Sequence, residues 1–442
     1  MASGSGRVMI GTRSAAFASL PEAGLVIIDE EHDSSYKQQD GFHYHARDLA
    51  IVRAKALNVP IILGSATPAL ESLHNAELGR YQLRSLHSRA GPAKPPGVRL
   101  VDVRKIKLLH GLGQDMLDGI RHCLEKGEQA LIFKNRRGYA PALLCHDCGF
   151  TAMCSRCDSP LTLHAGQKRL VCHHCGHQKP KPLACPDCGS LALQPQGFGT
   201  ERLEETLQQA FPDFPCIRVD SQSTRKKDGL EQQLNQLGQN PGILVGTQIL
   251  AKGHDLPLLS FVGVVGVDEG LYSADFRAPE KLAQLLVQLS GRAGRSVRAG
   301  SVLIQTHHPD HPLLHELLQG GYRQFARSAL AERRLAELPP YAYMALIRCE
   351  SVHSEAAQAF LQDAAGILKA RIKQGGMQMH SSGAIPAAMP KRAGKSRWQL
   401  ALSAGSRTEL QLLLAESIGD LHQLKSARKV RWSVDVDPTD FM

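Results

Sequence analysis

Short apolar runs alternate with helical stretches along most of the chain. The strand-like runs are Arg7 to Ile10, Gly24 to Ile28 and Val59 to Leu63 in a first set, and Gln129 to Phe133, Gly242 to Val245, Phe261 to Val267 and Ser301 to Gln305 in a second. A helical stretch, Ala46 to Leu57, separates two runs of the first set. This alternation favours α/β layers built on parallel sheets.

A leucine stripe near the end of the second set predicts a long helix. The leucines recur at helical spacing just before Gly291: Leu282, Leu285, Leu286 and Leu289. We expect this helix to pack one face on the sheet and to end at the glycine.

Beyond about Gly320 the order of elements changes, and a separate small α+β domain is predicted. A helix through Arg334 and a Pro339-Pro340 break come first. Strands and helices then alternate over Met344 to Glu350, Ser354 to Ile372, Trp398 to Ser403, Thr408 to Leu421 and Val430 to Val436. The Pro/Gly-rich passage from Gly91 to Gly97 is typical of a linker between two lobes.

These patterns divide the chain into five parts. We assign residues 1–90 to an incomplete first lobe, 91–105 to the linker, 106–144 and 194–318 to the two parts of a second lobe, 145–193 to an insert, and 319–442 to a C-terminal domain.

The insert is rich in cysteine and interrupts the α/β pattern. Eight of the eleven cysteines form four CxxC pairs: Cys145/Cys148, Cys154/Cys157, Cys172/Cys175 and Cys185/Cys188. One CxxC turn directs two thiolates at one zinc ion, and two such turns complete a closed tetrahedral site. Four pairs therefore predict two structural zinc ions. Gly149, Gly176 and Gly189 each follow the second cysteine of a pair, as a tight turn around a metal requires.

Other uses of the cysteines are less consistent with the pattern. A redox dithiol does not need four copies, and disulfides are disfavoured in a cytosolic protein. Because sulfur atoms already fill both coordination spheres, three nearby histidines are expected to be bystanders: His173, His174 and His177.

Charge and hydropathy narrow the classes of function. Lys and Arg exceed Asp and Glu by 52 to 42, which gives a net charge of +10. Such an excess suits contact with a polyanion, although a basic enzyme without such a partner remains an alternative. No apolar run approaches the roughly 18 residues of a membrane span. The start of the chain has no secretory apolar region, so we expect a cytoplasmic protein.

The first lobe carries a candidate site for nucleotide hydrolysis. Asp29-Glu30-Glu31-His32 follows the apolar run that ends at Ile28, and parallel strands present such residues at the ligand-binding edge of a sheet. ATP hydrolysis needs one carboxylate for Mg²⁺ and another to orient the attacking water. On that logic Asp29 holds the metal shell and Glu30 is the general base. Alone, the motif also fits a strand followed by an acidic surface loop.

Further motifs support the nucleotide site. Gly64 to Pro68 ends the next apolar run, which would place Ser65 and Thr67 beside the carboxylates. In the second lobe, Gly246-Thr247-Gln248 follows another apolar run, and Arg292 and Arg295 follow the leucine-striped helix. Such arginines can neutralise charge on a phosphate in the transition state. The order and spacing of these motifs are more specific than any one of them.

A phosphate-binding loop is missing from the printed residues. Gly394-Lys395-Ser396 is a poor candidate, because Met389 stands where the loop needs glycine. Only 28 residues precede Asp29, whereas one βαβ unit takes roughly 30 or more. We therefore expect this polypeptide to lack the ATP-gripping lysine and to be a poor ATPase by itself.

Together these motifs resemble the C-terminal part of the PriA family, superfamily 2 helicases that restart bacterial replication forks. The most particular segment is DEEHDSSYKQQDGFHYHARDLA, from Asp29 to Ala50. The others are GSATPALES (Gly64 to Ser72), FKNRRGYAP (Phe133 to Pro141), the four CxxC pairs, GTQILAKGHDLP (Gly246 to Pro257), QLSGRAGR (Gln288 to Arg295), QTHHPDHPLL (Gln305 to Leu314) and RWQL (Arg397 to Leu400). The likeness covers nearly all of the chain from about Arg7 onward.

The resemblance implies a role for each matching residue. It implies ATP with Mg²⁺ as cofactor and 3′→5′ unwinding of branched DNA, with His32 added to the catalytic set and Gln288 joining Ser65 and Thr67 in ATP coupling. It also implies that the zinc ligands are nested, with the outer two pairs on one metal and the inner two on the other. The DNA contacts it implies are Thr12, Arg13, Tyr36, Phe42, Tyr44, Arg136, Arg137, Thr247, Gln248, Lys391, Arg392 and Arg397.

The implied partners are branched and single-stranded DNA, single-strand DNA-binding protein and primosome proteins, in a cytoplasmic, nucleoid-associated setting.

Two positions depart from the family pattern. His43 stands where an arginine is expected, and Lys395-Ser396 where an arginine and an aromatic residue are expected. For Tyr36 to Tyr44, the alternative is that the aromatic side chains only pack within the loop. For the basic run from Lys391 to Arg397, the alternative is a solvated loop without a ligand.

Two other interpretations of the whole chain remain open. One is a non-catalytic fragment that binds DNA and proteins through the insert and the C-terminal domain. The other is a restriction or RNA helicase relative, which would carry a different accessory domain in place of the nested zinc pairs.

Overall fold

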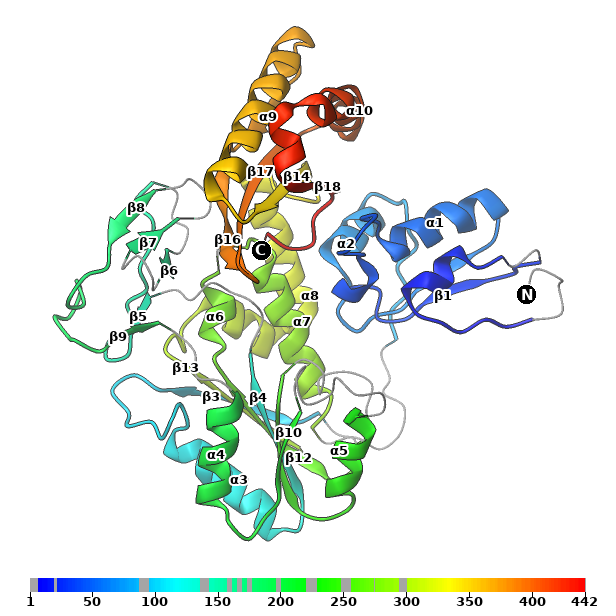
Figure 1. Cartoon of the computed structure of the whole chain (residues 1–442). Coiled ribbons are helices and arrows are strands. Elements are labelled where there is room, and N and C mark those ends of the chain that lie inside the picture. Colours follow the sequence, from blue (N-terminus) through cyan, green and yellow to red (C-terminus); the bar gives the residue numbers. More distant parts are fainter. Residues whose placement is uncertain are drawn as a thin grey trace. The chain divides into compact units, whose positions relative to one another are not determined.

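The chain divides into two units. In the computed structural model, unit 1 comprises Met1–Arg84 with Ser328–Phe441, and unit 2 comprises Ser85–Arg327 (Figure 1). The structure describes residues 7–19, 22–86, 95–135, 143–156, 161–164, 169–172, 177–195, 200–219, 229–247, 256–273, 275–293 and 300–441.

Unit 2 is built on a six-stranded parallel sheet. Its strands are β3 (Gly97–Asp102), β4 (Gln129–Lys134), β10 (Cys216–Val219), β11 (Gly242–Gly246), β12 (Leu259–Val265) and β13 (Ser301–Thr306), in the order β10-β11-β4-β12-β13-β3. Every residue of the central strand β4 is buried, as expected for a parallel strand covered on both faces. The α/β fold with a parallel sheet predicted from the apolar runs is confirmed.

Helices accompany this sheet, and some of them share its buried core. They are α3 (Gln114–Glu125), α4 (Thr200–Ala210), α5 (Gly229–Leu237), α6 (Asp268–Leu271), α7 (Ala278–Ser290) and the first part of α8 (Pro312–Leu335). Met116 and Ile120 of α3 and Leu207 of α4 join strand residues in one buried cluster. The predicted leucine-striped helix is α7, and it ends at Gly291 as expected.

The cysteine-rich insert consists of short antiparallel strands. Its strands are β5 (Leu143–Cys145), β6 (Thr162–His164), β7 (Arg169–Val171), β8 (Gln178–Pro180) and β9 (Leu193–Pro195). β5 pairs with β9, while β6, β7 and β8 form a separate small sheet. The β5–β9 pair closes the insert, because it joins its first and last residues.

The N-terminal segment of unit 1 holds a two-stranded parallel sheet. Its elements are a 3-10 turn η1 (Arg13–Phe17), β1 (Val26–Ile28), η2 (Ser34–Tyr36), α1 (Ala46–Leu57), β2 (Ile61–Leu63) and α2 (Leu70–Glu77). β1 and β2 pair in register, from Val26 opposite Ile61 to Ile28 opposite Leu63. The helix predicted at Ala46 to Leu57 has these bounds in the structure.

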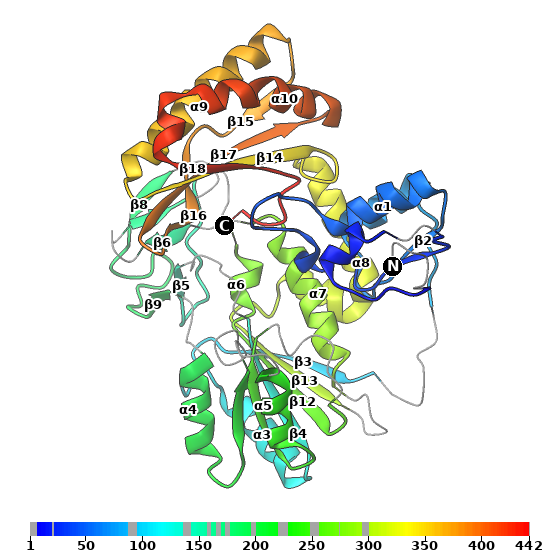
Figure 2. The same cartoon turned by 45° about the vertical axis from the view of Figure 1, so that its right-hand side comes forward.

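The C-terminal segment of unit 1 is an antiparallel sheet backed by two long helices (Figure 2). Its elements are β14 (Tyr343–Ser351), α9 (Ser354–Gln374), β15 (Met379–Ser381), β16 (Ile385–Arg392), β17 (Lys395–Ala404), α10 (Arg407–Gln423), η4 (Lys425–Lys429) and β18 (Arg431–Val436). The strand order is β15-β17-β14-β18, and β16 pairs with β17. The predicted α+β domain is therefore confirmed.

Several strand predictions differ from the structure. Arg7 to Ile10 forms no strand; Val8 and Ile10 are 76% and 94% exposed, so this apolar run lacks the neighbour that a strand needs. The strands β3, β10, β15 and β16 were not predicted, and neither were β5 to β9 of the insert. β3 directly follows the Pro/Gly-rich passage and is the edge strand of its sheet, so its apolar pattern is weak.

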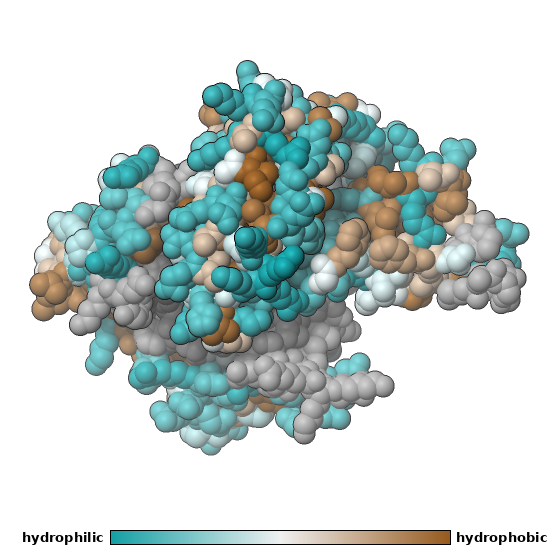
Figure 3. Space-filling view, turned by 45° about the horizontal axis from the view of Figure 1, so that its top comes forward, coloured by the Kyte–Doolittle hydropathy of each residue, from teal (hydrophilic) through white to brown (hydrophobic). Residues whose placement is uncertain are grey.

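Apolar side chains also gather on the surface of the N-terminal segment. Figure 3 shows apolar residues in brown at the right of the view, over the N-terminal segment. Ile27 of β1 and Ile62 of β2 are 64% and 51% exposed and stand opposite each other in the register. One face of the two-stranded sheet is therefore open to solvent.

Within the described ranges, no helix combines the length and apolar composition needed to span a membrane.

Close packing in unit 2 gives a first testable prediction. A Cβ at Gly263 of β12 would collide with the Met116 sulfur and would lie 2.8 Å from Ile132 Cδ1. We expect Gly263→Ala to lower the free energy of unfolding of unit 2 by about 1–3 kcal/mol, the usual effect of overpacking. Chemical denaturation measures this change.

The matched control is Gly97→Ala on the edge strand β3, where no atom lies within 4 Å of the added Cβ. Equal stability of the two variants would contradict the packing described for β12.

Candidate functional site

Four cysteines of the insert meet at one point. Cys145 Sγ lies 3.7 Å from Cys188 Sγ, and Cys148 Sγ lies 3.6 Å from Cys185 Sγ. All four sulfur atoms lie within 4.8 Å of one another. Tetrahedral zinc with Zn–S bonds of 2.3 Å requires S–S separations of about 3.8 Å. The four sulfur atoms therefore fit one tetrahedral zinc ion, and they belong to the outer two CxxC pairs.

Backbone turns hold the sulfur atoms in this arrangement. Gly149 N donates to Cys145 O and Gly189 N to Cys185 O, each at 2.9 Å. Both glycines have positive φ, +81° and +72°, which residues with a Cβ rarely adopt. The expected role of glycine after the second cysteine is thus observed in both outer turns. Four thiolates this close repel one another unless a cation compensates their charge.

The inner two pairs are only partly described. Cys154 and Cys172 are buried, whereas Cys157 and Cys175 lie outside the described residues. Of the three predicted bystander histidines, His173 and His174 also lie outside them, and the glycine Gly176 does too. The second predicted metal site therefore stays a prediction.

The outer cysteine cluster is tied to the parallel sheet through a chain of polar side chains. His146, next to Cys145, contacts His307 with 2.9 Å between Nδ1 and Nε2, and its Nε2 donates to the carbonyl oxygen of Ile106. His307 Nδ1 lies 2.8 Å from Asp268 Oδ2. Burial alone would raise the pKa of Asp268, but hydrogen bonds from His307 and Thr306 hold it below its usual value. The insert is thereby docked on the residues that follow β13.

The predicted carboxylate box lies at the carboxyl end of β1. Asp29 and Glu30 are exposed, and Glu30 adopts a left-handed backbone with φ of 47°. Asp29 Oδ1 accepts from the Glu30 backbone N–H at 2.9 Å. Two exposed neighbouring carboxylates at a sheet edge are open to a hydrated cation.

Glu31 differs from its neighbours because it is 1% exposed. Its Oε1 accepts from the Ala69 backbone N–H at 2.7 Å, and its Oε2 accepts from Ser72 Oγ at 2.8 Å and from Arg47 at 3.0 Å. Burial lowers the pKa of Arg47, but the charges of Asp48 and Glu31 outweigh it and raise that pKa. Glu31 therefore joins three segments of the first lobe instead of facing a ligand.

His32 connects the box to the motif after β2. His32 Nδ1 lies 2.7 Å from Ser65 Oγ and 3.5 Å from Glu30 Oε2, while its Nε2 lies 3.4 Å from Thr67 Oγ1. The Thr67 backbone N–H donates to Ser65 Oγ at 2.9 Å. The structure thus brings together Glu30, His32, Ser65 and Thr67, as the order of the motifs suggested.

The aromatic residues of the following loop are arranged in two ways. Tyr36 donates its hydroxyl to the Asp29 carbonyl at 2.7 Å, and burial, with the charge of Asp29, raises its pKa. Phe42 is 79% exposed and stacks on Tyr44, whose ring also meets Phe17 edge-on. Phe42 is therefore the ring available to a ligand.

Thr12 and Arg13 lie at the start of η1. Arg13 donates to the carbonyl oxygens of Ser35 and Lys37, at 3.1 and 3.2 Å, so its guanidinium is engaged with the loop backbone. Thr12 is exposed.

The predicted residues of the second lobe belong to unit 2. Thr247 follows β11 and is partly buried, Gln288 lies on α7, and Arg292 is 9% exposed just beyond that helix. Four further predicted residues lie outside the described ones: Arg136, Arg137, Gln248 and Arg295.

The predicted basic residues of the C-terminal domain lie on the β16–β17 hairpin. Lys391 and Arg392 are exposed near its tip, where Ala393 and Gly394 turn with φ of 48° and 79°. Arg397 is half-buried, and burial, with the charges of Arg348 and Arg392, lowers its pKa. The tip therefore offers two exposed cations to an anionic ligand.

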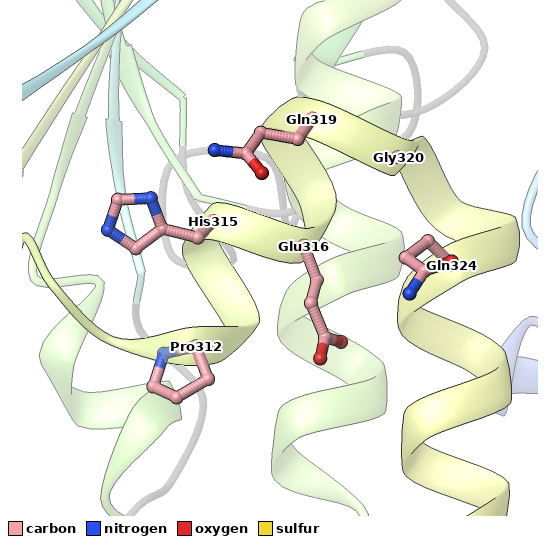
Figure 4. A pocket seen from close by; sticks show the side chains of 6 residues that line it. All are labelled: Pro312, His315, Glu316, Gln319, Gly320 and Gln324. Atoms are coloured by element: carbon pink, nitrogen blue, oxygen red, sulfur yellow. The ribbon is translucent and has the colours of Figure 1, made fainter.

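Unit 2 also has an open groove of about 410 Å³ along α8 (Figure 4). It is lined by Pro312, His315, Glu316, Gln319, Gly320 and Gln324. The groove follows a bend at Gly321, whose φ of 65° and ψ of −170° interrupt the helix. None of its lining residues belongs to the predicted sites.

Comparison with known proteins identifies the family. The Primosomal protein N C-terminal domain matches residues 334–439, the PriA DNA helicase Cys-rich region matches residues 154–180, and the Helicase conserved C-terminal domain matches residues 198–297. Replication restart protein PriA of Haemophilus influenzae is 47% identical over 439 residues, which cover 99% of this chain.

The chain belongs to the PriA family. A second relative, Replication restart protein PriA of Bacillus subtilis, is 38% identical over 98% of the chain. The chain spans 60% of the length of the first relative and 54% of the second. It therefore matches a portion of these PriA proteins.

The motif analysis missed two sets of residues around these sites. The first is Arg47 and Ser72, which bond Glu31. The second is the docking chain of His146, Asp268 and His307. The histidines of Gln305 to Leu314 were part of the family resemblance, but nothing in the sequence indicates that His307 contacts a residue 161 positions away.

The sulfur geometry predicts which cysteines bind the outer metal. We expect Cys185→Ser to lose about one zinc ion per chain relative to the unchanged protein, because it removes one of four ligands of a closed site. Metal analysis of folded, reduced protein measures the content.

Cys216→Ser is the control. Burial, with the charge of Glu204, raises the pKa of Cys216 to about 12, and this thiol lies outside the four-cysteine cluster. Unchanged zinc content in the Cys185 variant would show that this cluster holds no metal.

A half-buried histidine at the N-cap of α1 predicts a pH dependence. Burial, aided by the charge of Arg47, lowers the pKa of His45 from 6.5 to about 4. Between these values the unfolded chain binds more protons, so unit 1 loses stability as pH falls from 6.5 towards 4. We expect His45→Gln to remove roughly 3 kcal/mol of this loss, since one pKa unit corresponds to about 1.4 kcal/mol.

Urea unfolding at a series of pH values tests this expectation, with His380→Gln at an exposed position of the same unit as the control. A His45 variant that keeps the full pH dependence of the parent would contradict it.

Proposed function

We propose that the chain is the motor and C-terminal portion of a replication-restart DNA helicase. One observation carries the proposal: a PriA-family chain brings the carboxylate box after β1 against the Ser65–Thr67 motif after β2. Paired carboxylates beside polar side chains suit a magnesium–nucleotide complex. In this proposal the protein unwinds branched DNA in the 3′→5′ direction at stalled forks and initiates primosome assembly.

Each predicted residue has a proposed role. Asp29 binds Mg²⁺ through its hydration shell, and Glu30 is the general base for the attacking water. His32, Ser65, Thr67 and Gln288 couple the nucleotide to the rest of the motor. Arg292 and Arg295 neutralise charge on the transferred phosphate.

Bound ATP with Mg²⁺ would supply the free energy for unwinding. No GxxxxGK[ST] sequence occurs in the 442 residues. Such a loop cradles the phosphates with backbone N–H groups, and the carboxylates and arginines do not replace it. We therefore propose that this polypeptide hydrolyses ATP poorly by itself.

We also propose two structural zinc ions in the insert. The outer ion is bound by Cys145, Cys148, Cys185 and Cys188, and the inner one by Cys154, Cys157, Cys172 and Cys175. Bound zinc would hold together a segment with few apolar residues, without catalytic chemistry, because four sulfur ligands leave no open position.

The DNA contacts are proposed in three places. Bases of the single strand stack on Phe42, with Tyr36 and Tyr44. The backbone of the single strand is bound by Thr12, Arg13, Arg136, Arg137, Thr247 and Gln248. Branched DNA is contacted by Lys391, Arg392 and Arg397. Single-strand DNA-binding protein and primosome proteins are the proposed partners, in the cytoplasm at the nucleoid.

A second function is a DNA- and protein-binding module without ATP hydrolysis. The observation in its favour is that the printed residues contain no GxxxxGK[ST] sequence. DNA-stimulated ATP turnover by this polypeptide would exclude this second function. DNA binding without turnover is expected from both functions, so a reading frame that continues upstream of Met1 into GxxxxGK[ST] is the result that would favour the motor.

Phe42 offers a direct test of DNA binding. Its exposed ring can be removed with little effect on folding, and base stacking contributes roughly 1–3 kcal/mol per base. We expect Phe42→Ala to weaken binding to a fork with a single-stranded arm by about tenfold. Fluorescence anisotropy with labelled DNA measures the affinity at fixed salt.

Val52→Ala is the matched control, because Val52 is 65% exposed on α1 of the same unit. Equal fork affinity of the Phe42 variant and the control would overturn the proposed DNA contact.

A further inference from the structure

One fully buried lysine joins the first-lobe segment to the C-terminal domain within unit 1. Lys37 is 2% exposed, and its Nζ donates to the carbonyl oxygens of Val436 at 2.6 Å and Asp437 at 3.2 Å. The same Nζ forms an ion pair with Asp435 Oδ1 at 2.8 Å, and Asp435 is completely buried. Figure 2 shows the C-terminal end of the chain lying beside the loop between β1 and α1.

The surroundings of Lys37 match the chemistry of an ammonium group. A lysine ammonium has three donors and is strongly hydrated in water, so burial is tolerated only where oxygen atoms replace the lost water. Here two carbonyl oxygens accept hydrogen bonds from the ammonium group, and the Asp435 carboxylate lies beside it as an ion-pair partner. Removing one partner of such a pair leaves an uncompensated buried charge. Substitution of either residue is therefore expected to disrupt the contact.

Further contacts reinforce the same junction. Gln39 Nε2 donates to Thr439 Oγ1 at 3.3 Å and to Asp440 Oδ2 at 3.4 Å. Asp435 also pairs with Arg348 of β14, at 3.3 Å. Because β14 is a central strand of the C-terminal sheet, the loop is connected to the rigid part of that domain.

The other side of the loop is connected to the carboxylate box. Tyr36, next to Lys37, bonds the Asp29 carbonyl, and Arg13 donates to the Lys37 carbonyl. Lys37 forms a β-bridge with His45, and the Gln38 backbone N–H donates to Tyr44 O at 2.8 Å. Residues 36–45 thus form a closed loop, with Phe42 at its exposed part.

We propose that Lys37 and Asp435 are positioning residues through which the C-terminal domain holds the aromatic loop, residues 36–45, against the Asp29–Glu30 box. The anchor keeps Tyr36 on the Asp29 backbone and presents Phe42 to solvent. The role of Phe42 in DNA binding rests on the proposed function, whereas the anchoring of the loop does not. In this arrangement a ligand that moves the C-terminal strand β18 also moves the loop.

Hydrogen exchange tests the anchor without DNA or ATP. Lys37→Met removes the charge and keeps the length of the side chain, and Asp435 keeps Arg348 as a partner. We expect amide exchange in residues 36–45 to accelerate at least tenfold, while exchange in β14 and β17 stays unchanged. Asp435→Asn tests the same pair from the other side and should accelerate exchange in the same residues.

Arg371→Met is the matched control. Arg371 pairs with Glu416 and Asp420 between α9 and α10, in the same unit but away from the loop. This variant should leave exchange in residues 36–45 unchanged. Unchanged loop exchange in Lys37→Met, or equal acceleration in the Arg371 control, would overturn the anchor.

A double-mutant cycle then links the anchor to DNA. If the anchor presents Phe42, Lys37→Met and Phe42→Ala weaken fork binding non-additively, because the second change removes a contact that the first has already misplaced. Accelerated loop exchange with fork affinity unaffected by Phe42→Ala supports the anchor and overturns the proposed DNA contact. Strictly additive losses would overturn the presentation of Phe42 by the C-terminal domain.

Discussion

Parallel strand pairing is the constraint on which the candidate sites depend. β1 and β2 pair in register, so the residues after Ile28 and after Leu63 emerge at the same edge of the sheet. His32 and Ser65 meet there although 33 positions separate them. The same constraint operates in unit 2, where β12 and β13 lie side by side and Asp268 meets His307 beyond their ends. Strand direction thus determines which distant side chains become neighbours.

Buried charged groups then determine the positions of loops that strand pairing leaves undetermined. Glu31 joins the box to Arg47 at the start of α1 and to the first turn of α2, and Lys37 joins the next loop to β18. Each buried charge has several partners, as desolvation requires. Apolar packing alone would allow these loops many positions. The polar contacts select one, and therefore determine the geometry of the candidate sites more than the stability of the fold.

The sequence predicted those features that depend on local pattern. Apolar runs located β1, β2, β4 and β11 to β13, and leucine spacing located α7, because burial of neighbouring residues defines those elements. Edge strand β3 was missed, since only one of its six residues is buried. CxxC spacing predicted metal binding but not which pairs meet; closure of β5 against β9 brings Cys145 near Cys188. Lys37 could not be predicted from its neighbours, because its partner lies about 400 positions away.

The contrast between Glu30 and Glu31 has a consequence for inherited variants of this gene product. An exposed Glu30 contributes little to folding, so its loss would leave the amount of folded protein close to normal. Glu31 is buried and holds three segments, so its loss would raise the unfolded fraction, which proteases remove. Of two adjacent glutamates in one motif, only the buried one would thus control the cellular abundance of the protein.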